Sequence, residues 1–220
     1  MPWEIACIAV LLGLVVGSFL NVVIYRLGQK SGAPFWRGRS HCMSCKAVLR
    51  WFELVPVFSY LLQRGRCRRC GTRISAQYIA VEVLTAALFV GVYLHLAALP
   101  FAYEALWWVL LALHLVFWSL MVVVAVYDMR TTLIPDALSI SLALSALFIL
   151  GANGWGGMLT GSEVLAHIAA GALLFVPFWL LWRVSGGRWI GLGDGKLAIS
   201  IGLLLGVWGG IAAVVYAFWI

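Results

Sequence analysis

Long apolar runs recur along the 220-residue chain, and they limit its possible folds more than any other feature. Hydrophobic residues make up 64% of the sequence and charged residues only 10%. A run of about 20 apolar residues can cross the hydrocarbon core of a bilayer as one helix. Six runs are candidates, at about residues 5–24, 79–99, 105–127, 134–150, 164–182 and 197–220. The sequence therefore predicts an all-α polytopic membrane protein with about six transmembrane helices.

Basic residues are distributed unevenly between these spans. Eleven of the fifteen Lys and Arg residues lie between Arg26 and Ile79, and the positive-inside rule makes that segment cytoplasmic. Alternation from there places the turns near 100–104 and 151–163, which contain no Lys or Arg, outside together with both termini. The four remaining basic residues all fall inside. Orientation and anionic headgroups account for this basic surplus, so no nucleic acid is expected as a partner.

Two CxxC pairs lie in this cytoplasmic insert between the first and second spans. Cys42 and Cys45 form one pair, Cys67 and Cys70 form the other, and 21 residues separate them. The cytoplasm is reducing, which argues against two structural disulfides. Four thiolates suit a closed tetrahedral zinc site, and so short a segment needs a metal because it buries little core. We therefore expect structural zinc, with free or redox-active thiols as the alternative.

Polar and small residues occur inside the first two spans. Gly13 and Gly17 form a small-xxx-small pair, and Asn21 follows on roughly the same side of the helix. We interpret these three residues as helix-packing positions, with the Asn21 amide bonded to a neighbouring helix. Glu82 lies one turn inside the second span, where we expect a buried ion pair with an arginine of the insert.

An aspartate between glycines opens the last span, in the sequence Ile190-Gly191-Leu192-Gly193-Asp194-Gly195-Lys196. A charged group at this depth is costly and is seldom kept without a function. The glycines permit positive φ and leave room for a peptide to approach the carboxylate. Asp128 ends the third span, and the predicted topology puts it at the same depth and on the same face as Asp194. Asp136 follows Pro135 and is interpreted as an ordinary helix start favoured by the macrodipole.

Two convergent aspartates are typical of acid–base hydrolysis. Because like charges held close together cannot both ionise readily, one carboxyl keeps its proton while the other activates water. The sequence contains no HExxH zinc motif and no GxSxG nucleophile elbow. The residues alone therefore indicate an aspartyl-type membrane hydrolase. The alternative is a zinc-stapled transporter or scaffold whose intramembrane acids line an ion path.

Further motifs occur in a fixed order along nearly the whole chain, and together they resemble the type IV prepilin peptidase family. They comprise Gly17-Ser18-Phe19-Leu20-Asn21 with Tyr25-Arg26, the two CxxC pairs, Arg64-Gly65-Arg66-Cys67, Ile74-Ser75 with Tyr78 and Glu82, Asp128 before Leu133-Ile134-Pro135-Asp136, and Gly191-Leu192-Gly193-Asp194. The resemblance implies that Asp128 and Asp194 are the catalytic pair. It also implies that Cys42, Cys45, Cys67 and Cys70 bind zinc.

The resemblance implies a bifunctional enzyme of the bacterial inner membrane. Its substrates would be type IV prepilins or pseudopilins, whose leader is cut on the cytoplasmic side. The new N-terminus would then be methylated from S-adenosylmethionine, an activity associated with the insert. The methyl-donor side is assigned to Glu53, Gly65 and Arg66.

Three segments are expected on this basis. Residues 1–25 would form the first transmembrane helix, residues 26–78 the cytoplasmic zinc-binding insert, and residues 79–220 the transmembrane peptidase core. Family members usually continue for one or two spans past the helix that follows Asp194, whereas this chain stops at Ile220, so either a fragment of a longer protein or a short form is expected.

Overall fold

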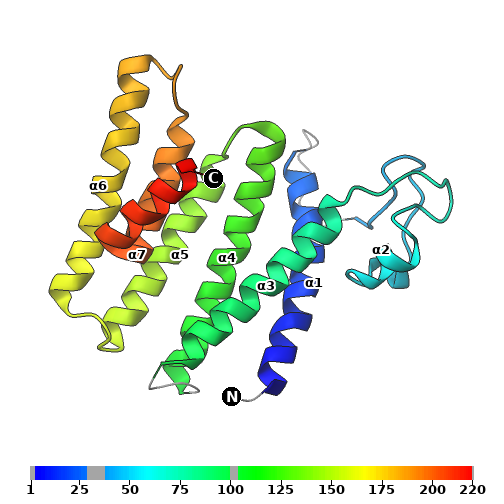
Figure 1. Ribbon diagram of the computed structural model, residues 1–220, viewed down its shortest axis with the longest axis horizontal. Coiled ribbons are helices and arrows are strands. Elements are labelled where there is room, and N and C mark those ends of the chain that lie inside the picture. Colours follow the sequence, from blue (N-terminus) through cyan, green and yellow to red (C-terminus); the bar gives the residue numbers. More distant parts are fainter. Residues whose placement is uncertain (1–2, 29–37, 100–103, 220) are drawn as a thin grey trace. The chain divides into compact units, whose positions relative to one another are not determined.

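The computed structural model describes residues 3–28, 38–99 and 104–219 as an all-helical protein (Figure 1). No strand occurs in these ranges, and most of the predicted turn near 100–104 lies outside them. The six long helices are α1 (Trp3–Leu27), α3 (Gln77–Ala97), α4 (Ala105–Thr131), α5 (Asp136–Trp155), α6 (Gly161–Ser185) and α7 (Leu192–Trp219). Two short elements, η1 (Trp51–Leu54) and α2 (Phe58–Leu62), lie in the insert. The fold class predicted from the sequence is thus confirmed.

All six long helices are long and apolar enough to cross a membrane. Their ends differ from the sequence prediction by a few residues because polar residues continue several helices past the apolar run. The fourth span, expected at 134–150, is a full α5 that continues through Asn153. The last span, expected from residue 197, begins at Leu192, so Asp194 lies inside the first turn of α7.

The chain forms two compact units. The first comprises residues 1–102 with the last turns of α4 (125–131), and the second comprises residues 103–124 and 132–220. Helices α1 and α3 pack together in the first unit, whereas α7 packs against α6 and α5 in the second. Helix α4 is continuous but is divided between the two units. Its last turns, which the predicted topology makes cytoplasmic, belong to the first unit, and the rest of the helix belongs to the second.

Small residues allow α1 to approach α3 closely. A Cβ atom added at Gly13 would lie 2.5 Å from the Cα of Ala86, and one added at Gly17 would lie 2.7 Å from the Cα of Glu82. Either distance is shorter than real side chains tolerate, so only glycine fits. The predicted packing role of the pair is confirmed, and it brings Glu82 against the backbone of α1.

Asn21 bonds α1 to the start of α3. Its amide Nδ2 donates to the carbonyl oxygens of Gly17 (3.3 Å) and Tyr78 (3.0 Å). The bond to a neighbouring helix was expected from the sequence and is confirmed. Because only the nitrogen of the amide can donate to two carbonyl oxygens, these bonds identify Nδ2 and fix the orientation of the amide. Oδ1 then points away from both carbonyls.

Helix α7 is interrupted at Gly206, where φ is 68° and ψ is −171° (Figure 1). Such a conformation breaks the helical hydrogen-bond ladder within a membrane span. The break leaves the carbonyl of Leu203 without its helical partner, and His167 of α6 replaces that partner because its Nδ1 donates to this oxygen at 3.0 Å. One turn before Gly206, α7 is in close contact with α6: a Cβ atom added at Gly202 would lie 2.7 Å from the Cα of Gly171.

Candidate functional site

The four cysteines of the insert lie at the tips of two hairpin turns with the same hydrogen-bond pattern. In the first, the N–H of Cys42 donates to the carbonyl of Ala47, and an antiparallel bridge joins His41 to Val48. In the second, the N–H of Cys67 donates to the carbonyl of Thr72, and Arg66 is bridged to Arg73. Each hairpin turns through a positive φ, at Lys46 and at Gly71 respectively. The insert therefore contains one structural unit twice.

The four sulfur atoms form a compact cluster. All of them lie within 4.8 Å of one another, and Sγ of Cys42 is 3.9 Å from Sγ of Cys70. Sulfur atoms at the corners of a tetrahedron with a metal–sulfur distance of about 2.3 Å are about 3.8 Å apart. The cluster can therefore hold a tetrahedral metal ion, and the sequence prediction that these residues come together is confirmed. The imidazole of His41 is not part of it.

The protonation of the thiols also favours a cation. The Thr72 hydroxyl and backbone N–H lower the pKa of Cys70 to about 6, and the backbone N–H of Cys45 lowers the pKa of Cys42. The N–H of Ala47 acts in the same direction on Cys45, but desolvation and the three neighbouring sulfurs raise its pKa to about 11. Clustered thiols compete for ionisation, and a cation among them relieves that competition.

The insert has almost no core of its own. Between residues 38 and 76 the only buried residues are Gly65 and Cys67, and Cys67 is 8% exposed. The hydroxyl of Thr72 bridges the two hairpins, since it contacts Sγ of Cys70 and donates to the Ser44 hydroxyl at 3.2 Å. A metal at the four sulfurs would therefore be the main link between the hairpins.

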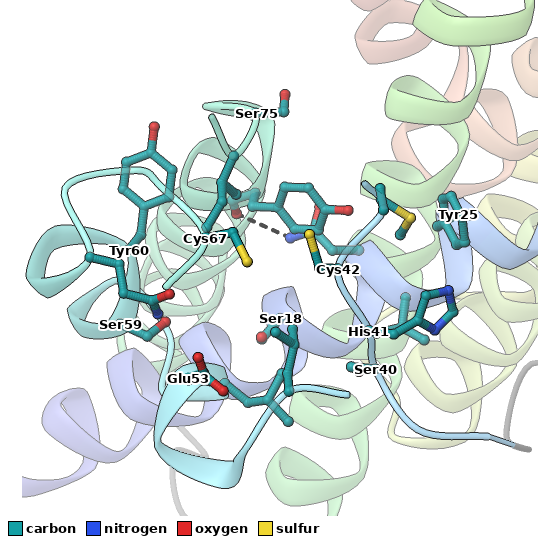
Figure 2. A pocket seen from close by; sticks show the side chains of 18 of the residues that line it. Ser18, Tyr25, Ser40, His41, Cys42, Glu53, Ser59, Tyr60, Cys67 and Ser75 are labelled. Atoms are coloured by element: carbon teal, nitrogen blue, oxygen red, sulfur yellow. Dashed lines mark hydrogen bonds between the residues drawn. The ribbon is translucent and has the colours of Figure 1, made fainter. Parts of the chain in front are cut away.

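A cavity of about 450 Å³ lies inside the first unit, between the insert and the ends of α1, α3 and α4. This volume is in the usual range of small-molecule sites. Figure 2 shows Ser18 and Glu53 on one side of the cavity and the sulfur atoms of Cys42 and Cys67 directed toward its interior. Its other polar lining residues include Asn21, Tyr25, Tyr60, Tyr78, Glu82 and the arginines Arg26, Arg39, Arg73 and Arg130. The sequence did not reveal this cavity, because its walls come from four separate segments.

Glu82 links α3 to the insert. Its carboxylate is 7% exposed and accepts a hydrogen bond of 2.7 Å from the N–H of Val57, at the start of α2. The Ser18 hydroxyl also bonds to it. The partners are thus a backbone N–H and a hydroxyl, and the expected ion pair with an arginine is wrong. Val57 has φ 60°, a strained conformation for a β-branched residue, and the short bond to Glu82 helps to hold it.

The three residues assigned to the methyl-donor side lie in different places. Glu53 lines the cavity, and its Oε2 accepts a hydrogen bond of 2.8 Å from the N–H of Arg50. Gly65 and Arg66 lie in the turn that enters the second hairpin and are not lining residues. Gly65 has φ 65°, and the Tyr60 ring lies only 3.0 Å from where a Cβ would stand. The assignment of all three stays a prediction.

Asp194 lies in a tightly packed first turn of α7. A Cβ atom at Gly193 would lie 3.0 Å from Cβ of Ile134, and one at Gly195 would lie 3.0 Å from Cβ of Phe178. Neither glycine has a positive φ. Close packing, and not a left-handed backbone conformation, is therefore the reason for glycine on both sides of this aspartate.

Asp128 lies in the last turn of α4, in the first unit. The helix ends at Thr131, and Thr132 follows with φ 53°, the left-handed conformation that commonly terminates helices. Arg130 in the same turn donates from Nε to the Gln77 side chain at 2.8 Å, which joins this turn to the start of α3. The pairing of Asp128 with Asp194 stays a prediction.

Asp136 has a partner that the sequence did not reveal. Pro135 is the N-cap of α5, and Asp136 is the first residue of the helix. The carboxylate forms an ion pair with Nζ of Lys196, two residues after Asp194. Asp136 therefore contributes more than a helix start, because it joins α5 to the first turn of α7.

Replacing Asp136 with Asn is expected to have a small effect. The side chain of Asp136 is 71% exposed and that of Lys196 is 31% exposed, so the pair and the dipole interaction together contribute about 1 kcal/mol or less. Thermal unfolding in detergent would measure this loss, and peptide cleavage should stay largely intact. Lys196→Gln is the matched variant, and a loss of cleavage in either would show that this ion pair is required for catalysis.

The fold and the cysteine cluster define a multi-pass membrane protein with four clustered thiols, able to hold a metal ion, between its first two spans. Residues 11–96 match the bacterial peptidase A24 N-terminal domain, and residues 115–220 match the type IV leader peptidase family. The chain belongs to this family and is a membrane peptidase. Membership sets aside the transporter or scaffold alternative.

Relatives named prepilin leader peptidase/N-methyltransferase align with nearly the whole chain. A protein of Burkholderia pseudomallei (strain 1026b) is 35% identical over 90% of this chain and 68% of its own length. One from Aeromonas hydrophila is 32% identical over 94% and 75%, and one from Klebsiella pneumoniae is 34% identical over 88% and 82%. No solved structure matches the chain.

Proposed function

We propose that the protein removes the leader peptide of type IV prepilins or pseudopilins by aspartyl catalysis. The observation that carries the proposal is the placement of Asp194 in the first turn of α7, within the range 115–220 that matches the leader peptidase family. The printed names of the relatives supply the substrate class. Asp128, in the last turn of α4, is the second carboxylate.

The cleavage side is cytoplasmic. Alternation of six spans from the basic insert puts the end of α4 and the start of α7 at cytoplasmic helix ends, in the bacterial inner membrane. Four basic residues remain outside the insert, and they lie at these helix ends: Arg130 at the end of α4, Arg183 at the end of α6, Arg188 before α7 and Lys196 near the start of α7. Their positions support this orientation.

Catalysis follows from two carboxyl groups that share one proton. The ionised aspartate takes a proton from water, which attacks the scissile carbonyl, while the protonated aspartate donates to the carbonyl oxygen. When the C–N bond breaks, the newly protonated aspartate donates its proton to the leaving amine and the other aspartate takes a proton from a hydroxyl of the tetrahedral intermediate, so the pair again shares one proton. Neither carboxylate can do both steps alone.

The insert supports zinc binding and methylation. Cys42, Cys45, Cys67 and Cys70 would hold a structural Zn²⁺, because four thiolates complete a tetrahedral shell and leave no position for a substrate. S-adenosylmethionine would supply an electrophilic methyl group to the new N-terminus. The relatives' name includes this activity, and Glu53, Gly65 and Arg66 remain the residues assigned to the donor side.

One assay tests both activities. Purified protein is incubated with a prepilin and isotopically labelled S-adenosylmethionine, and intact masses of the products are read. We expect loss of the leader followed by a labelled methyl group on the new N-terminus. A protein that cleaves without methylating would limit the function to the peptidase, and a folded, metal-loaded protein that leaves several prepilins intact would contradict the proposal.

A further inference from the structure

The cavity of the first unit contains a buried hydrogen-bond acceptor without a partner. Oδ1 of Asn21 is fully enclosed, and no described residue donates to it. The amide cannot turn to relieve this, because Nδ2 is already committed to the carbonyls of Gly17 and Tyr78. An unsatisfied buried acceptor is costly, and a ligand with an N–H or O–H donor would recover that cost.

A second acceptor lies near it. Glu82 lines the same cavity from α3, and the Gly17 contact holds α1 against the backbone at this residue. The N–H of Val57 and the Ser18 hydroxyl both bond to the Glu82 carboxylate, but two oxygens offer about four lone-pair sites, so acceptor capacity remains. An amide oxygen and a carboxylate in one half-buried cavity are complementary to an ammonium group, which offers three donors and a positive charge.

The location of the cavity identifies the source of such a group. Arg130 lines the cavity and follows Asp128 by half a helical turn, and its bond to Gln77 joins that turn to α3. If Asp128 takes part in cleaving a prepilin, the mature peptide is released next to this cavity, and its new N-terminus is a primary ammonium group. The insert on the opposite wall is the segment associated with methylation.

We propose that the cavity binds the N-terminal amine of the cleaved peptide, with Asn21 Oδ1 accepting one of its N–H groups and Glu82 accepting its proton. This inference rests on the methylating half of the proposed function. The ammonium loses one proton to Glu82, and the freed lone pair of the nitrogen forms the N–CH₃ bond. The C–S bond of the sulfonium donor breaks with its electron pair left on sulfur, and Glu82 returns its proton to solvent.

Photo-crosslinking tests binding apart from activity. The probe is a synthetic peptide with the mature N-terminal sequence of a pseudopilin, a free amine and a diazirine on its first residue. With the full-length wild-type protein, we expect peptide mapping to place the label on α1 around Asn21 and on α3 around Glu82. The same peptide with an acetylated N-terminus should lose this labelling. Equal labelling by both peptides, or labelling only elsewhere, would overturn the proposal.

Substitution tests the proton acceptor. Glu82→Gln keeps an oxygen for the Val57 N–H but cannot take a proton, so methyl transfer should fall about 100-fold or more. Leader cleavage and metal content are measured on the same sample, because both report whether the variant is folded. Thr85→Val is the matched control, since Thr85 is buried one turn further along α3 and bonds only within its own helix.

The outcomes separate this inference from the proposed function. If the wild-type and Glu82→Gln proteins methylate equally well, this inference is wrong and the proposed function still stands. A wild-type protein that transfers no methyl group removes the methylating function. If Glu82→Gln fails to fold, as shown by lost cleavage and lost metal, the crosslinking map decides.

Discussion

The Asp194→Asn protein is expected to lose leader cleavage by roughly a factor of 1,000 or more while remaining folded. Asparagine keeps the size and hydrogen bonding of the side chain but cannot exchange a proton. Asp128→Asn should cause a similar loss for the same reason. Mass spectrometry of a prepilin incubated with each purified variant measures the effect.

The double variant adds a sharper test of the same idea. Because the two carboxyl groups act as one unit, removing both should cost little more than removing either. The pH–rate profile should likewise belong to the pair and not to a single residue. Asp136→Asn serves as the control. Substantial cleavage by the Asp194→Asn protein, with a contaminating peptidase excluded, would refute the aspartyl mechanism.

Cys67→Ser is expected to remove the metal almost completely, from one ion to below about 0.1 per chain. Cys67 is a proposed metal ligand and one of only two buried residues in the described part of the insert. The substitution therefore removes a metal–sulfur bond and an apolar side chain from the interior of the insert. Elemental analysis measures the metal, and limited proteolysis between residues 38 and 76 measures the folding of the insert.

Cys7→Ser is the matched control, because Cys7 is exposed on α1 and belongs to no cluster among the described residues. The variant should keep its metal and its protease resistance. A wild-type protein that is folded, active and free of stoichiometric metal would rule out a structural zinc.

The sequence was sufficient to predict the elements whose signals are local. Apolar length marked all six spans, and the CxxC spacing marked the thiol cluster, because both depend on residues close together in the chain. The Gly13 and Gly17 pair was likewise interpreted correctly as a close helix contact. These features needed no knowledge of how the segments meet.

Features formed by distant segments could not be predicted in this way. The bonds from Val57 and Ser18 to Glu82 depend on how the insert folds back onto α1 and α3, and nothing in the local sequence indicates it. The ion pair of Asp136 with Lys196 is of the same kind. The glycines beside Asp194 were recognised, but their contacts with Ile134 and Phe178 required the packed structure.

The interruption of α7 at Gly206 has a mechanical consequence for Asp194. The part of α7 before Gly206 is only about 20 Å long, shorter than a full membrane span. It is held to α6 at two levels: Gly195 packs against Phe178 near its start, and the Gly171–Gly202 contact and the bond from His167 to Leu203 lie near its end. Displacements of the chain beyond Gly206 are therefore absorbed at the glycine, whereas any displacement of Asp194 requires α6 to move with it as one body.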